Sequence, residues 1–160
     1  MNSKELVLSI FRDKGAADAQ DLRNRASTLD GTALIAEEEK IPRFDPTRDY
    51  SAWPAGAPVW DEVDGERQVY TLITPYNASY YSMTSPSALP ALWSVRHTRD
   101  SHKAKPWLPP NGTSGLYEVD ECCTQNSHVW KNRQAGNAFS PEAMPSYWED
   151  LGAIEEVKGS

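Results

Sequence analysis

The chain has 160 residues, of which 39% are hydrophobic and 24% charged, and its formal net charge is −7. This length suits one ordinary domain or two small ones. The negative charge argues against a general nucleic-acid-binding protein and against adhesion to an anionic membrane surface, because both need a surface rich in lysine and arginine.

The first residues, MNSKELVLSIFRDKG, do not resemble a secretory signal, because their apolar part is too short and charged residues follow it. Elsewhere no apolar run approaches the roughly 20 residues that a membrane span needs. We therefore expect a protein that is made and folded in a cytoplasm, without membrane insertion.

Residues 1–41 are predicted to be helical. Asn2 and Glu5 form a plausible capping pair before an apolar stripe, and Gly15 is expected to end this helix. A second helix is expected from Asp18, followed by a short helical turn in TALIAEEEK. These helices are too short and too sparsely apolar to form a core alone. They must pack on the rest of the chain, on a copy of themselves, or on another protein.

After residue 42 the pattern is typical of strands and turns. Two hairpins are predicted: residues 59–70 around Asp64-Gly65, and residues 117–130 with a turn near Gln125-Asn126-Ser127. The polar segment between them has few apolar residues and is predicted to be a linker.

A nine-residue phrase occurs twice, as SPSALPALW at 85–93 and SPEAMPSYW at 140–148. The difference in residue number between matching positions falls along the chain, from 64 before the first hairpin turn to 60 after it and to 55 within the phrase itself. The upstream matches are Pro46/Pro110, Trp53/Tyr117, Val59/Cys123, Tyr70/Trp130 and Asn77/Asn137. The first copy thus carries extra pieces of about four and five residues, one assigned to the hairpin turn and one to residues 79–84. Insertions in turns are typical of structural repeats, so we interpret the chain as a tandem duplication.

The predicted divisions follow from this repeat. They are a helical oligomerisation or docking segment at 1–41, a first β module at 42–97, a linker at 98–105, a second β module at 106–152 and a tail at 153–160.

The order of aromatic residues resembles the small chitin-binding, family 5/12 type carbohydrate-binding modules. The first copy matches with Phe44, Trp53, Gly56, Val59, Tyr70, Asn77, Pro86 and Trp93, and the second with Trp107, Tyr117, Cys123, Trp130, Asn137, Pro141 and Trp148. Tandem units behind a short helical N-terminus are similar to those of small bacteriophage or prophage tail-region proteins. The resemblance implies a mainly β fold: two tandem small modules of short twisted sheets, preceded by a short α-helical segment.

Aromatic residues were divided into core and contact candidates. Sugar binding needs exposed rings that stack on pyranose C–H groups. Trp60 is out of phase with Val59, so it is expected to face outward, and the tyrosines near residues 76–81 have no counterpart in the second copy. The predicted contact residues are Trp53, Trp60, Tyr76, Tyr80, Tyr81, Trp107 and Tyr117. The predicted core residues are Val59, Tyr70, Trp93, Cys123, Trp130 and Trp148.

No catalytic residue, metal ligand or cofactor is predicted. The acidic residues of the hairpins are more simply explained as solvated strand faces. The histidines His97, His102 and His128 are expected to face solvent. Cys122 and Cys123 are adjacent, so they should point to opposite faces of a strand as reduced, partly buried thiols.

These features together predict a non-enzymatic virion protein of a phage or prophage-derived particle, made in the host bacterial cytoplasm. Residues 1–41 would contact other virion proteins and copies of the same chain, and the paired modules would bind host cell-surface polysaccharide with avidity. An alternative is a purely structural tail, baseplate or capsid accessory whose aromatic residues anchor interfaces without binding sugar. A third alternative is an accessory of a glycan-active or lytic enzyme.

Overall fold

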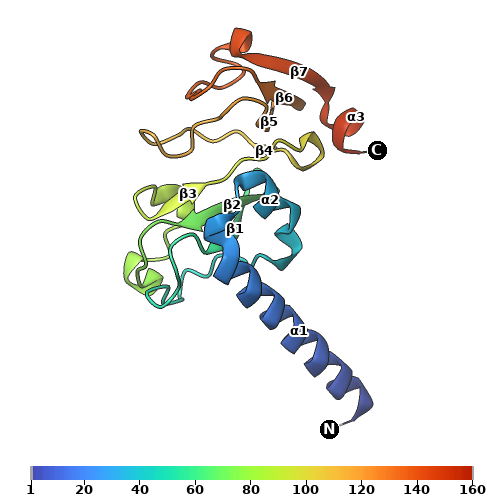
Figure 1. Ribbon diagram of the computed structural model, residues 1–160, viewed down its shortest axis with the longest axis vertical. Helices are drawn as coiled ribbons and strands as arrows, with labels where there is room; N and C mark the ends of the chain where they lie inside the picture. The colour runs from blue at the N-terminus through green and yellow to red at the C-terminus, as the bar shows by residue number, and fades with distance from the viewer. Residues whose placement is uncertain (1, 160) are drawn as a thin grey trace.

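The computed structural model describes residues 2–159. It contains a long N-terminal helix and two small sheets, one of three strands and one of four (Figure 1). Helices hold 34% of the residues and strands 26%, so the fold is mixed rather than mainly β. No helix within residues 2–159 is both long enough and apolar enough to cross a membrane.

Helix α1 spans Ser3–Arg25 without interruption. Its start is the predicted capping box: the Asn2 side chain accepts from the Glu5 N–H at 2.8 Å, and the Glu5 carboxylate accepts from the Asn2 N–H at 3.1 Å. The prediction that Gly15 ends this helix is wrong. A helical glycine costs only about 1 kcal/mol relative to alanine, and the alanines that follow it are the best helix formers.

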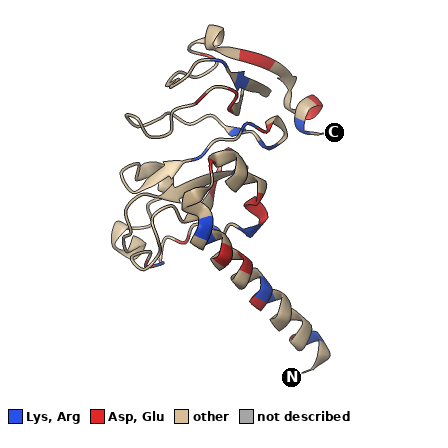
Figure 2. Cartoon of the chain, viewed as in Figure 1, with Lys and Arg blue, Asp and Glu red and all other residues tan. Residues whose placement is uncertain are grey.

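The N-terminal half of α1 projects away from both sheets (Figure 1). Leu22, near the end of α1, is its buried residue, and it packs under the first sheet together with Ala26, which follows the helix. Positively and negatively charged side chains alternate along the free part of the helix (Figure 2). The short helix α2 (Gly31–Ala36) follows, and the Asp30 side chain caps it by accepting from the Ala33 N–H at 2.8 Å.

The first sheet has the order β1-β2-β3, all antiparallel, with β1 at Pro58–Val63, β2 at Glu66–Leu72 and β3 at Trp93–Val95. Asp64 and Gly65 form the predicted two-residue turn, both with positive φ (51° and 79°). One face of the sheet carries an aromatic core that includes Tyr70 and Trp93. The N-terminal helices cover the other face.

The second sheet has the order β4-β5-β6-β7, with β4 at Lys105–Pro106, β5 at Cys122–Gln125, β6 at His128–Asn132 and β7 at Trp148–Ala153. Strands β4 and β5 are parallel, and the other pairs are antiparallel. Cys123 lies in an aromatic core on one face. Cys122 lies on the other face, near side chains of helix α3 (Ile154–Lys158). The two thiols are therefore free, buried and on opposite faces, as predicted.

The two sheets contain equivalent hydrogen bonds, made by residues that the repeat aligns with one another. Val59 pairs with Tyr70, and Cys123 pairs with Trp130. The bond from Phe44 N–H to Trp60 C=O is repeated from Trp107 N–H to Thr124 C=O. At the other end of each unit, the Ile73 N–H donates to the Leu92 C=O at 2.7 Å, and the Arg133 N–H donates to the Tyr147 C=O at 2.8 Å.

Two details of the predicted repeat need correction. Both hairpins have two-residue turns, so the four extra residues lengthen strands β1 and β2 by two residues each instead of enlarging the turn. In ring packing, Tyr117 corresponds to Tyr50 rather than to Trp53, the residue that the repeat aligns with it. Tyr50 contacts Trp93 edge-on at 5.3 Å between ring centroids, as Tyr117 contacts Trp148 at 5.1 Å.

The segment 98–105 is not a free linker. Thr98 is fully buried, and its C=O accepts from the Cys122 N–H at 2.7 Å. Lys105 is buried and its ammonium lies 2.5 Å from the Glu38 carboxylate, which joins the second sheet to the N-terminal segment. Residues 154–158 of the predicted tail form helix α3, and the Lys158 ammonium donates to the Ala104 C=O at 2.7 Å. Below, the first unit means residues 42–97 and the second unit residues 98–159.

Candidate functional site

The loop at residues 79–84, called the tyrosine loop below, has no counterpart in the second unit. A 3-10 helix at Ala78–Tyr81 begins it, and the Asn77 side chain caps this helix by accepting from the Ser79 N–H at 3.1 Å. Ser82 and Met83 then adopt positive φ values of 50° and 66°. Tyr80, which lies shortly before these two residues, is 81% exposed.

The base of the tyrosine loop is anchored in the first core. Tyr81 is 41% exposed, and its ring meets the buried ring of Tyr76 edge-on at 5.2 Å. The Tyr76 hydroxyl in turn accepts from the Trp93 indole N–H at 2.7 Å. The loop therefore presents two tyrosine rings on a fixed base. Tyr76 itself is buried, so the prediction that it contacts a ligand is wrong.

Trp53 and Trp60 are half-buried, and arginine guanidinium groups lie over both rings. Arg23 and Arg48 lie 4.2 and 5.3 Å from the Trp53 ring centroid. Two further arginines lie over Trp60 at 4.9 and 4.3 Å. Trp60 does point away from Val59, but toward the N-terminal helices that cover this face. Each cation–π contact is worth about 0.5–1 kcal/mol at an exposed site, so a ligand that stacked there would have to displace an arginine.

The candidates of the second unit belong to its core. Tyr117 is 1% exposed and stacks on His97 with ring centroids 3.6 Å apart. Trp107 packs against the same core, and its buried indole N–H has no hydrogen-bond partner within residues 2–159. The prediction that Tyr117 contacts a ligand is therefore wrong, because a ring packed on both an imidazole and an indole cannot receive a sugar.

Five of the six predicted core residues are buried. Val59, Tyr70, Trp93, Cys123 and Trp148 are all buried. Trp130 is only half-buried, and its indole N–H donates to the Gln125 C=O at 3.0 Å.

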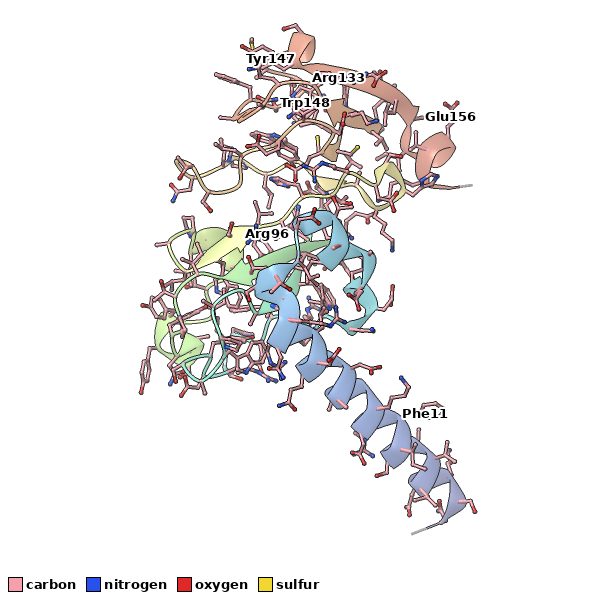
Figure 3. The ribbon with its side chains drawn as sticks, in the orientation of Figure 1. Phe11, Arg96, Arg133, Tyr147, Trp148 and Glu156 are labelled. Atoms are coloured by element: carbon pink, nitrogen blue, oxygen red, sulfur yellow. The ribbon has the colours of Figure 1, made fainter. Side chains whose placement is uncertain are left out.

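A polar cleft of about 220 Å³ lies where the two units meet, and Arg96, His97, Glu118 and Glu121 line it. Figure 3 shows Arg96 at the level between the two sheets. Burial lowers the pKa of His97 to about 4, although its hydrogen bond to the Gly115 C=O at 2.9 Å favours the charged form. Burial raises the pKa of Glu121, whose carboxylate accepts from the Glu118 N–H at 2.6 Å.

Each of these polar groups already has a partner within the fold. Arg96 donates to the Thr71 hydroxyl at 2.9 Å, and the Glu118 carboxylate accepts from the Gly136 N–H at 3.1 Å. The side chains that line the cleft therefore serve to join the two units. His97 was predicted to face solvent, and the structure corrects this, because an imidazole stacked on Tyr117 fills the junction.

The other two histidines are accessible. His128 pairs with Asp150 at 2.8 Å, and this hydrogen bond lowers the pKa of the Asp150 carboxyl. His102 lies 3.5 Å from Asp100 on the surface. Among residues 2–159, no three His, Cys, Asp or Glu side chains gather closely enough to hold a metal ion.

No protein-family model matches this chain, and no curated protein matches it either. The site must therefore be interpreted from its geometry. The tyrosine loop is the part of the predicted contact set whose rings are both exposed and held on a fixed base.

Proposed function

We propose that the chain is a non-enzymatic component of a phage or prophage-derived virion, and that its tyrosine loop binds polysaccharide on the host surface. The observation that supports this proposal is the exposure of Tyr80 and Tyr81 on an anchored loop that the second unit lacks. Phenol rings offer flat faces for pyranose C–H groups, and their hydroxyls can bond the sugar's own hydroxyls.

The free half of α1 supports assembly with copies of the same chain. Leu6, Val7, Leu8, Ile10 and Phe11 are each about half exposed or more. At 100° per residue they cover an arc of about 200° around the helix, which is much wider than the narrow seam of a two-stranded coiled coil. Phe11 lies on the free end, away from both sheets (Figure 3). Three or more parallel copies would cover this arc and carry the β units together at one end of the bundle.

Such assembly would strengthen weak sugar binding. A bundle holds several tyrosine loops at high effective concentration, so the avidity exceeds the affinity of one loop by orders of magnitude. Light scattering of the full chain and of a Phe11→Glu variant tests this step, with Arg12→Glu as a charge-reversal control on the same helix. We expect an oligomer for the native chain and the control, and a monomer for Phe11→Glu. A monomeric native chain would contradict the assembly proposal.

A glycan array that includes chitin oligosaccharides and bacterial cell-wall polysaccharides tests the binding proposal on the full chain. We expect binding to at least one polysaccharide, lost when Tyr80 and Tyr81 are both replaced by alanine. Binding that survives this change would show that the loop is not the site.

A second candidate function is a structural virion accessory that binds no sugar. Met83, which is 70% exposed in the same loop as Tyr80, favours this candidate, because exposed methionine and tyrosine side chains are typical of protein interfaces. An empty array, together with burial of the tyrosine loop against a neighbouring subunit in the assembled particle, would support it.

A further inference from the structure

A pocket of about 240 Å³ lies between the aromatic face of the first sheet and a loop of the second unit. Tyr70 of β2 and Trp93 of β3 line it from the sheet. Pro86 and Pro90, from the first copy of the repeated phrase, form a rigid wall beside them. This pocket is separate from the tyrosine loop, because neither Tyr80 nor Tyr81 lines it.

The loop that closes the pocket is held in place at several points. Asn111 and Ser114 line the pocket and exchange two backbone hydrogen bonds of 2.9 Å. The Ser114 hydroxyl also donates to the Ser94 hydroxyl at 3.2 Å. Gly115 follows at φ 81°, where a Cβ would lie only 2.9 Å from a methyl group of Val95. Glycine therefore lets the loop approach the sheet closely enough to form the second side of the pocket.

The polar group of interest is the hydroxyl of Tyr70, which is one of the residues that line the pocket. The Tyr70 hydroxyl is buried and has no hydrogen-bond partner among the residues that the structure describes. Burial raises the pKa of Tyr70 to about 12, so this hydroxyl keeps its proton at neutral pH. The Ser87 side chain lies near the Tyr70 hydroxyl and slightly lowers its pKa, but the two hydroxyls do not form a hydrogen bond of normal geometry. A buried hydroxyl left unpaired destabilises the fold, and a ligand that moved the side chains covering it and bonded it would recover that energy.

The lining sets the chemistry of a ligand. None of the side chains that line the pocket is charged, and most are aromatic, proline or aliphatic. An apolar cavity of about 150 Å³ is large enough for benzene, so 240 Å³ accommodates one ring with a substituent. A pyranose is a poorer fit, because its several hydroxyls would lose water against prolines and rings.

We propose that this pocket binds a small neutral ring compound with one hydrogen-bonding group that reaches the Tyr70 hydroxyl. Phenol is the simplest compound of this class. The second unit differs at the aligned positions: Trp130 replaces Tyr70 and already bonds the Gln125 C=O, and Glu142 replaces Ser87. The pocket therefore depends on residues in which the two copies diverged.

Titration of the full chain with phenol, followed by ¹H–¹⁵N NMR, tests this proposal. We expect saturable shifts of the Trp93 indole N–H and of the Ser87 and Ser114 amides. Tyr70→Phe should weaken phenol binding about three- to tenfold and leave toluene binding unchanged, because toluene cannot use the hydroxyl. Equal weakening for both probes would contradict the role of the hydroxyl.

A filled pocket provides the second comparison. Ser87→Leu should abolish the shifts by occupying the pocket, whereas Glu142→Leu, the aligned change in the second unit, should leave them intact. Spectra of both variants without phenol show whether each is folded. If native protein gives no saturable shifts at millimolar phenol, or if Ser87→Leu binds phenol as native protein does, the proposal is overturned. Neither result depends on whether the tyrosine loop binds sugar.

Discussion

Replacing His97 by glutamine should remove a component of the protein's acid sensitivity. The imidazole is 6% exposed, and burial lowers its pKa from the ordinary 6.5 to about 4. Because the folded state resists protonation, the unfolded chain takes up the proton first. Stability is therefore complete above pH 6.5 and is lost as the pH falls toward 4. The gap between the two pKa values corresponds to about 3 kcal/mol of unfolding free energy.

Glutamine can still donate to the Gly115 C=O, but it does not titrate. Urea denaturation of native protein and His97→Gln between pH 7.5 and 4 should show a steeper loss in the native protein, by about 3 kcal/mol over this range. His102→Gln, at an exposed position, is the matched control for the substitution itself. Parallel profiles for native protein and His97→Gln would refute the buried, neutral state of His97. If the variant does not fold, the NMR titration of His97 in native protein decides the same point.

Two further substitutions test how the parts are joined. Glu38→Gln should destabilise the fold by about 3 kcal/mol, because it leaves the buried Lys105 ammonium unpaired. Combining it with Lys105→Met should recover most of that loss, as measured by thermal denaturation. Asn132→Leu introduces the residue of the first unit, Leu72, at the aligned position. It should cost at least about 3 kcal/mol, because the NH2 group of the fully buried Asn132 side chain has three backbone carbonyls within hydrogen-bond distance. Measured stability within about 1 kcal/mol of native would contradict the role of this network.

Features set by neighbouring residues could be predicted from the sequence. The capping box at Asn2 and the turn at Asp64-Gly65 depend on local backbone preferences, and both occur in the structure. The aligned pairs of the repeat could be found because insertions altered the spacing without changing the order of residues. The continuity of α1 through Gly15 could not be predicted, because the small helix-propensity penalty of one glycine does not decide whether a helix continues.

Features set by distant contacts could not be predicted. The segment 98–105 has the composition of a linker, yet Lys105 is buried because Glu38, 67 residues earlier, neutralises it. Similarly, a tyrosine beside a turn can face either way. Tyr76 and Tyr80 are four residues apart, and one bonds the core indole while the other is the most exposed aromatic ring. Only the tertiary fold separates candidate contacts from core.

The most direct test of the proposed function is the affinity of the oligomeric chain for a polysaccharide identified on the array. Biolayer interferometry would compare native protein with the Tyr80→Ala/Tyr81→Ala variant, and with Phe139→Ala as an exposed aromatic control in the second unit. We predict that the double variant binds at least about tenfold more weakly and that the control binds as native protein does. Equal affinity for native protein and the double variant would contradict the proposal that the tyrosine loop is the binding site.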